Sequence, residues 1–185
     1  MITSKSYKAK SDASFDQLTN NIVLLAKKIA IVADKNNKKY FFGEGLAIDF
    51  SVGKITRNHH DIDFHPTLKD YDWWKEWFKS QGYSIEEPAN EDFPETCHVV
   101  DNNSENIVDL WPFVFEKNMC VINYKGKYVN ANRYPSENIK ITYEGMNIEI
   151  ENPQRVLDQK LKHIKDGGEL RPQDIHDFKI LGREL

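Results

Sequence analysis

The sequence predicts an α+β protein in which helices flank one mixed β-sheet and two further helices close the chain. Three observations lead to this fold class. Apolar residues recur at helical spacing in several separate segments, while the middle of the chain alternates polar and apolar residues as strands do. Turn-forming pairs such as Lys125-Gly126 and Glu144-Gly145 divide that middle part into hairpins. The 185 residues, 39% of them hydrophobic, are enough to bury one substantial core.

Composition and charge narrow the kind of protein further. We expect a flexible N-terminal segment at 1–13, a core at 14–151 and a C-terminal helical segment at 152–185 packed on that core. The formal net charge of −4 and the pI of about 5.9 argue against a nucleic-acid partner. No apolar run reaches the ~20 residues of a membrane span, so the sequence predicts a cytoplasmic protein, either a monomer or a homodimer.

The first half of the chain reads as helix, strand, helix, strand, helix. Ser14 followed by Gln17 is a capping-box pattern, and the apolar residues after it form one helical stripe: Leu18, Ile22, Leu25, Ala26, Ile29 and Ala33. The segment 40–43 is a short apolar strand ended by glycine, and 45–53 is a short helix between glycines. The segment 60–66 alternates at period two until a proline, which predicts a strand.

The second half is expected to be rich in strands and to end in two helices. Thr67 with Asp70 predicts a helix that Gly82 ends. Strands are predicted at 83–86, at 95–101 and 106–115, at 119–124 and 127–131, and on both sides of Glu144-Gly145. Asn152 and Pro153 open the next helix, and the last helix spans about 172–183, with Ile175, Phe178, Ile180 and Leu181 as its apolar side.

Two carboxylates stand two residues apart in the predicted strand 60–66. Residues i and i+2 of a strand face the same way, so Asp61 and Asp63 would project from one face about 6.6 Å apart. Two adjacent negative charges are unfavourable unless a cation lies between them or one carboxyl stays protonated. Oxygen ligands alone favour a hard ion, Mg²⁺ or Mn²⁺, over zinc. Such an ion usually serves phosphate chemistry, where it bridges triphosphate oxygens.

A two-metal site needs a third carboxylate on a neighbouring strand. Asp109 lies in the middle of the apolar run Ile107, Val108 and Leu110, where a charged side chain is normally excluded unless it is paired or binds a metal. Asp92 and Asp101 stand in turn-like contexts and suit the third place less well than Asp109. The sequence therefore predicts a site for two Mg²⁺ ions held by Asp61, Asp63 and Asp109.

Upstream of these carboxylates lies a pattern that suits a triphosphate. Gly43 and Gly45 would let the backbone approach a phosphate, and the helix after them offers free N–H groups. Thr56-Arg57 follows, and the Arg57 guanidinium would bind triphosphate oxygens. Asp49 would orient Arg57 or the nucleotide, although a cap or an ion pair inside the site fits it equally well.

Together these residues resemble the small antibiotic nucleotidyltransferases, the aminoglycoside 2″-adenylyltransferase and lincosamide nucleotidyltransferase group of the DNA polymerase β-like superfamily. The resemblance rests on Gly43, Gly45, Ala47, Asp49, Gly53, Thr56-Arg57, His59 or His60, Asp61-Ile62-Asp63, the run "VDLWPF" at 108–113, and Arg171, Asp174 and Asp177 of "LRPQDIHDFKIL". It implies a polymerase β-like fold and a Mg-dependent transfer of a nucleoside monophosphate, AMP from ATP, to a hydroxyl of an aminoglycoside or lincosamide type of acceptor, with release of pyrophosphate. Asp109 would be the third metal ligand and the general base.

Two positions depart from the family pattern and bear on the substrates. Glu44 stands between the glycines, where the superfamily often has a small residue beside the phosphates, and Trp111 stands where relatives often have histidine. Glu44, His60 and Trp111 are therefore the candidate substrate contacts.

Three other functions remain open at the level of sequence. The acceptor of the same chemistry could be a protein or a tRNA, as in toxin–antitoxin systems. Glu44 is compatible with a non-catalytic nucleotide-binding module. His59, His60 and His65 with Asp61 would suit a zinc hydrolase, although these three histidines do not share one strand face.

Overall fold

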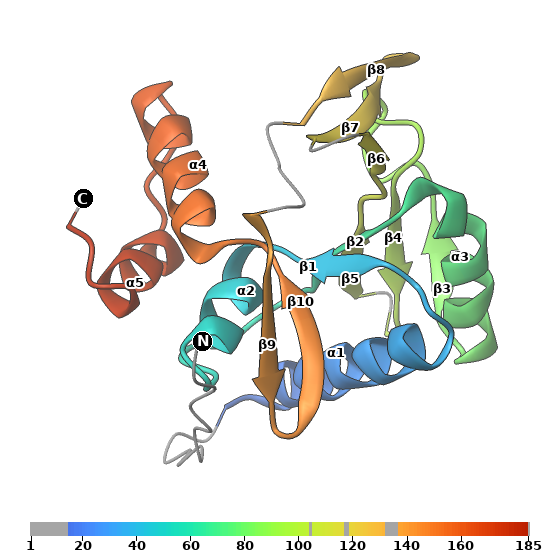
Figure 1. Cartoon of the computed structure of the whole chain (residues 1–185), viewed down its shortest axis with the longest axis horizontal. Helices are drawn as coiled ribbons and strands as arrows, with labels where there is room; N and C mark the ends of the chain where they lie inside the picture. The colour runs from blue at the N-terminus through green and yellow to red at the C-terminus, as the bar shows by residue number, and fades with distance from the viewer. Residues whose placement is uncertain (1–14, 104, 117–118, 132–136, 185) are drawn as a thin grey trace.

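The computed structural model describes residues 15–103, 105–116, 119–131 and 137–184, and it has the predicted α+β architecture (Figure 1). Seven strands form one mixed sheet in the order β3-β4-β5-β2-β1-β10-β9. Its strands are β1 Tyr40–Phe42, β2 Asp63–Pro66, β3 Ser84–Glu86, β4 Cys97–Val100, β5 Asn106–Leu110, β9 Ile139–Tyr143 and β10 Met146–Ile150. β2 runs parallel to β5 and antiparallel to β1, whereas β1 runs parallel to β10. The predicted mixed sheet is confirmed.

Three strands form a smaller antiparallel sheet at one end of the molecule, drawn at the upper right of Figure 1. They are β6 Val114–Glu116, β7 Met119–Tyr124 and β8 Lys127–Asn130, in that order. The predicted single strand 106–115 is therefore wrong, because β5 ends at Leu110 and β6 begins at Val114. Pro112 between them has no N–H to give to a ladder, and the chain crosses there from one sheet to the other.

The N-terminal helix α1 spans Gln17–Lys35, and Asp16 caps it by accepting a hydrogen bond of 2.7 Å from the Thr19 N–H. The predicted capping residue Ser14 lies outside the described residues. The predicted strand 60–66 begins only at Asp63. β1 ends at Phe42, whose register partner is Phe64, and the chain then turns into helix α2, Glu44–Ser51, so β2 has no β1 partner before Asp63.

The segment after β2 starts with a 3-10 turn, Leu68–Asp70, and continues as α3, Tyr71–Ser80. The predicted single helix from Thr67 is thus two elements. The Thr67 hydroxyl donates to the Asp70 carboxylate at 2.7 Å instead of capping the backbone. Gly82 follows the helix with a φ of +91°. This left-handed conformation is typical of a glycine just beyond a helix end, which is where the sequence predicts Gly82.

Helices α1 and α3 cover one face of the large sheet. Their buried side chains, Ile22, Ile29, Trp74 and Phe78 among them, pack with Phe42, Phe64 and Leu110 of β1, β2 and β5. Because side chains alternate along a strand, Phe41, Asp63, His65 and Asp109 lie on the opposite face. The helix-covered core therefore fixes the strands that carry the predicted carboxylates.

The chain ends in helices α4, Pro153–Lys165, and α5, Pro172–Ile180. Asn152 caps α4 as predicted, with its side chain accepting from the Gln154 N–H at 3.0 Å. A separate core of Ile48, Val156, Leu157 and Phe178 joins α2, α4 and α5. Ile175 is 48% exposed, so its predicted place on the apolar side of α5 is wrong. Within the described parts of the chain, no helix is long and apolar enough to cross a membrane.

Candidate active site

Asp63 and Asp109 lie side by side on neighbouring parallel strands. Asp63 opens β2, Asp109 lies within β5, and the two residues are register partners. Both side chains are partly exposed on the sheet face that α1 and α3 leave uncovered. Of the three predicted metal ligands, these two are brought together by the sheet itself.

Asp61 lies in the segment just before β2, two residues ahead of Asp63 and outside the assigned strand. The chain is nevertheless held against β5 there, since the Ile62 N–H donates to the Ile107 carbonyl at 3.0 Å. Burial and then the charge of the Asp109 carboxylate raise the pKa of Asp61 above its ordinary value. Asp61 is thus close to the Asp63–Asp109 pair, and a bound cation would relieve the repulsion between these charges.

Two residues that sequence reasoning did not single out orient Asp109. The Asn106 side-chain amide donates to Asp109 Oδ1 at 2.6 Å, and His98 Nε2 lies 3.5 Å from the same oxygen. His98 is the register partner of Asp109 on β4, and Asn106 opens β5. Only the antiparallel pairing of β4 with β5 brings His98 to this place, so the linear sequence gave no signal for it.

A polar cavity of about 750 Å³ opens beside the carboxylates and extends to α4 and α5. Asp61, Asp63 and Asp109 line one part of it, and the cations Arg57, Lys160 and Arg171 line another. Charges of both signs in one cavity of this size suit an anionic ligand that also binds a metal ion.

Lys160 is buried within the wall of the polar cavity. Its Nζ lies 2.8 Å from Asp174 Oδ1, 3.3 Å from Glu44 Oε2 and 3.5 Å from Asp177 Oδ2. Burial opposes its charge, but these carboxylates raise the pKa of Lys160 above its ordinary value. Lys160 is therefore a charged lysine in the cavity.

Arg57 reaches the polar cavity across Gly45. A Cβ atom at Gly45 would lie 2.0 Å from Arg57 Nη2, so a larger residue would displace the guanidinium from this position. Arg57 Nε donates to Asp177 Oδ1 of α5 at 3.1 Å. Both predicted nucleotide-binding residues thus line the cavity, but Gly45 serves the packing of Arg57 as well as any approach of a phosphate.

Three other predicted nucleotide-binding residues do not line the polar cavity. Asp49 is fully buried and accepts hydrogen bonds from Thr56 N–H at 2.9 Å, from the Thr56 hydroxyl and from His59 Nε2 at 2.7 Å. The Thr56 hydroxyl in turn accepts from His176 Nε2 at 2.8 Å. The Gly43 N–H donates to the Asp63 carbonyl at 2.9 Å and so does not point to a ligand. Asp49 and Thr56 therefore hold the segment that carries Arg57, and Asp49 forms hydrogen-bonded pairs inside the site, one of the two roles that the sequence left open.

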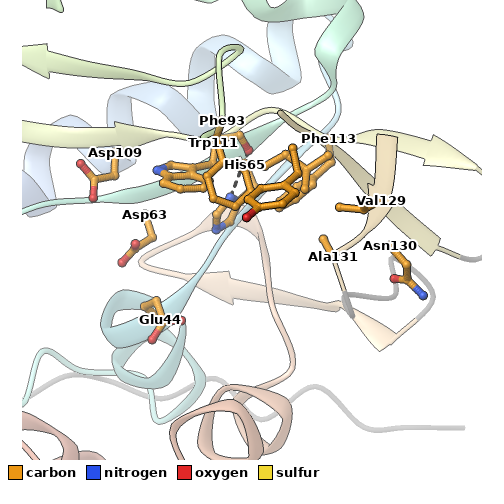
Figure 2. Close-up of a pocket in the computed structure, with 12 residues that line it drawn as sticks. Glu44, Asp63, His65, Phe93, Asp109, Trp111, Phe113, Val129, Asn130 and Ala131 are labelled. Carbon is orange, nitrogen blue, oxygen red and sulfur yellow. Dashed lines mark hydrogen bonds between the residues drawn. The ribbon is translucent and has the colours of Figure 1, made fainter. Parts of the chain in front are cut away.

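A second cavity of about 510 Å³ shares its acidic end with the first, and Figure 2 shows the residues that line it. Glu44, Asp63 and Asp109 line both cavities. The second one, the aromatic cavity, is otherwise lined mainly by apolar side chains, namely Phe93, Trp111, Phe113, Ile122, Tyr124 and Val129. Trp111 therefore contacts the aromatic cavity, whereas His60 lines the polar one.

The three histidines of the zinc hypothesis are separated. His59 pairs with Asp49, and His65 packs against the rings of Phe41 and Phe113 at centroid distances of 4.8 and 5.2 Å. Among the residues that the structure describes, no three His, Cys, Asp or Glu side chains converge as ligands of one metal ion. A chain-held zinc site of the predicted composition is absent from these residues.

The mixed sheet, with paired carboxylates on adjacent parallel strands and helices behind them, defines the fold of a nucleotidyltransferase. The family model of the aminoglycoside-2″-adenylyltransferases matches residues 25–181. The chain belongs to this family of nucleotide-transferring enzymes. No protein of curated function matches the sequence significantly.

Solved structures share the fold at low sequence identity. The lincosamide antibiotic adenylyltransferase LnuA with lincomycin bound matches with a TM-score of 0.69 and 18% identity, covering 90% of this chain and 98% of its own. ANT(2″)-Ia in complex with adenylyl-2″-tobramycin matches with a TM-score of 0.64 and 18% identity, covering 88% and 87%. A nucleotidyltransferase-like protein from Paracoccidioides brasiliensis matches with a TM-score of 0.54 and 14% identity, covering 88% of this chain and 76% of its own.

Proposed function

We propose that this enzyme transfers AMP from ATP to a hydroxyl group of a small antibiotic-like acceptor and releases pyrophosphate, with magnesium as the metal. The observation that carries the proposal is the place of Asp63 and Asp109, where the polar and aromatic cavities meet. A nucleotide in one cavity and an acceptor in the other would present their reacting atoms to the same carboxylates. The structures of LnuA with lincomycin and of ANT(2″)-Ia with adenylyl-2″-tobramycin support a small antibiotic-like acceptor.

The polar cavity would take the triphosphate. Arg57, Lys160 and Arg171 supply cationic donors for the phosphate oxygens, and Asp177 holds the Arg57 guanidinium in place. These interactions fix the α-phosphate near the carboxylates and so lower the entropic cost of the reaction.

Asp63 and Asp109, with Asp61 beside them, would hold magnesium, with manganese as an alternative. The residues fit such an ion, because two paired carboxylates and a third with a raised pKa form an oxygen-only, strongly negative site. A hard cation there offsets charge on the triphosphate. Since the described side chains do not complete a three-ligand site by themselves, phosphate oxygens would supply the remaining ligands.

Asp109 would take the proton of the acceptor hydroxyl, with Asn106 fixing its orientation. The acceptor oxygen forms a bond to the α-phosphorus, and the bond from that phosphorus to the bridging oxygen of the β-phosphate breaks. Pyrophosphate leaves with the electron pair, and the proton remains on the Asp109 carboxylate. The products are the adenylylated acceptor and pyrophosphate. We expect this reaction in the cytoplasm, where ATP is available.

The proposal is tested by incubation with ATP labelled at the α-phosphate, Mg²⁺ and a panel of lincosamides and aminoglycosides. We expect labelled product and pyrophosphate from the wild type. Asp63→Asn should lower kcat by at least about a hundredfold, because several kcal/mol of charge stabilisation are lost and each ~1.4 kcal/mol is tenfold. Asp72→Asn, which changes a carboxylate that is 89% exposed on α3, is the matched control.

Two results would contradict the proposal. ATP that fails to bind in the presence of Mg²⁺, measured by calorimetry, excludes a nucleotidyltransferase of this kind. ATP that binds tightly without pyrophosphate release, with any member of the panel, favours a nucleotide-binding module instead.

A further inference from the structure

The aromatic cavity carries an acceptor preference that the family does not define. We propose that the acceptor of this enzyme is a hydroxylated molecule with an apolar or aromatic face and at most one cationic group, and that polycations are poor acceptors. This inference rests on the proposed function, because it assigns the aromatic cavity to the acceptor.

The first observation is the distribution of charge in the aromatic cavity. Its acidic residues, Glu44, Asp63 and Asp109, all lie at the end shared with the polar cavity. Figure 2 shows them on one side, with Val129, Asn130 and Ala131 on the other and the rings of Trp111 and Phe113 between. None of the side chains that the structure places along the rest of this cavity is acidic. Among the residues that the structure describes in this lining, an acceptor with several ammonium groups would find no carboxylate for those far from the reaction centre.

The second observation is that two carboxylates of the adjoining loop, Asp92 and Glu95, are engaged outside the cavity. Asp92 pairs with Lys125 Nζ at 3.3 Å, and its carbonyl accepts from the Lys125 N–H at 2.7 Å. Glu95 accepts from the Tyr128 hydroxyl at 3.0 Å. These contacts join the loop to the hairpin of β7 and β8. Neither carboxylate lines the cavity, so neither serves a cationic acceptor there.

The third observation is that the apolar wall is already formed. The ring of Phe93 lies 4.9 Å from that of Trp111 and 5.2 Å from that of Tyr124, and Phe113 and Ile122 are buried beneath. An apolar face of the acceptor would gain binding free energy in proportion to the area that it buries there. One cation could bind over an aromatic ring, whereas each further unpaired ammonium would lose its hydration without compensation.

The test measures acceptor binding and turnover in the full-length enzyme with ATP or a nonhydrolysable ATP analogue and Mg²⁺. Lincomycin, which has one amine and an alkyl chain, is compared with tobramycin, which has several amines. We expect kcat/KM for lincomycin to be at least about tenfold higher than for tobramycin. This factor corresponds to the free energy gained by burying an apolar surface about as large as one apolar side chain. Equal or better use of tobramycin would overturn the inference, as would failure of both acceptors while ATP binds.

A charge placed on the wall gives a second readout. Val129 is 38% exposed on β8 and lines the cavity, so Val129→Glu should fold and should improve tobramycin binding by about two- to fivefold. Val129→Gln has the same shape without the charge and should not improve it. No difference between the two variants would contradict acceptor binding in this cavity. Calorimetry of ATP binding separates the failures: a chain that does not bind ATP refutes the proposed function, and with it this inference.

Discussion

Glu44 holds an unusual backbone conformation at the point where the two cavities meet. Its φ is +47°, in the left-handed region that a non-glycine residue adopts at a cost of about 1–2 kcal/mol. It also places a carboxylate among residues that would bind phosphates, with Oε2 at 3.3 Å from Lys160 Nζ. The acid therefore pairs with a cation that a triphosphate would also need, and the two anions would compete.

Removal of the Glu44 charge should strengthen nucleotide binding. We expect Glu44→Gln to lower the Kd for ATP by roughly five- to tenfold. The reason is that the substitution removes one nearby negative charge, whose repulsion of the triphosphate is partly screened by solvent and salt. Calorimetry with Mg²⁺ at two salt concentrations measures it, and the gain should shrink at the higher one. Glu144→Gln is the control, because Glu144 also has a φ of +47° but lies at the β9–β10 turn and pairs with Lys27. Weaker ATP binding in Glu44→Gln would instead make Glu44 a ligand.

At the scale of elements, a cluster of buried charges joins three helices at the site. Lys160 of α4 contacts Asp174 and Asp177 of α5 and Glu44 of α2, while Arg57 reaches Asp177 from the loop before β2. Loss of one partner from such a cluster leaves an uncompensated buried charge, which is strongly destabilising. The helices are thereby held in the orientation that directs Lys160 and Arg57 into the polar cavity.

The contribution of this cluster to the free energy of unfolding should depend on pH below about pH 4. Burial alone would raise the pKa of Asp174, but hydrogen bonds from Arg171 and Lys160 hold it well below the ordinary 3.8. A carboxyl with a depressed pKa in the folded state stabilises the protein above its unfolded pKa, and this stabilisation is lost as the pH falls toward the folded value. Wild type should therefore exceed Asp174→Asn in free energy of unfolding at pH 6, with the difference shrinking below about pH 4.

Denaturant unfolding between pH 6 and pH 2.5 measures that difference. The control is Asp158→Asn, since Asp158 of α4 is 51% exposed and its pair with Arg183 lies at the surface. This variant should stay within about 1 kcal/mol of wild type at every pH. A constant difference between wild type and Asp174→Asn down to pH 2.5 would exclude a role for the Asp174 charge.

At the scale of the whole molecule, sequence patterns predict the elements better than their contacts. The period of the apolar residues predicts the mixed sheet and its helices, and Asp63 and Asp109 stand out as charges in apolar strands. Ile175 and the segment 106–115 show the limit, because exposure on a short helix and a crossing between sheets depend on tertiary packing. Asp49, Thr56 and Gly43 share the motif with Arg57, and a motif alone does not tell a ligand contact from a support. Lys160 and His98 belong to elements far apart in the sequence from the other site residues, so only the three-dimensional fold assigns them to the site.

Ligand binding should stabilise the molecule as one unit, because the polar cavity is built from the sheet, α2, α4 and α5 together. An ATP analogue with Mg²⁺ at a hundred times its Kd adds about 2.7 kcal/mol to the free energy of unfolding. For a chain of this length, that corresponds to a rise in Tm of about 5–10 °C. Thermal unfolding with and without EDTA measures it, with Asp63→Asn as the variant that should lose most of the shift. If EDTA leaves the full shift in place, the nucleotide binds without a metal, and the metal-binding role proposed for Asp63 and Asp109 is wrong.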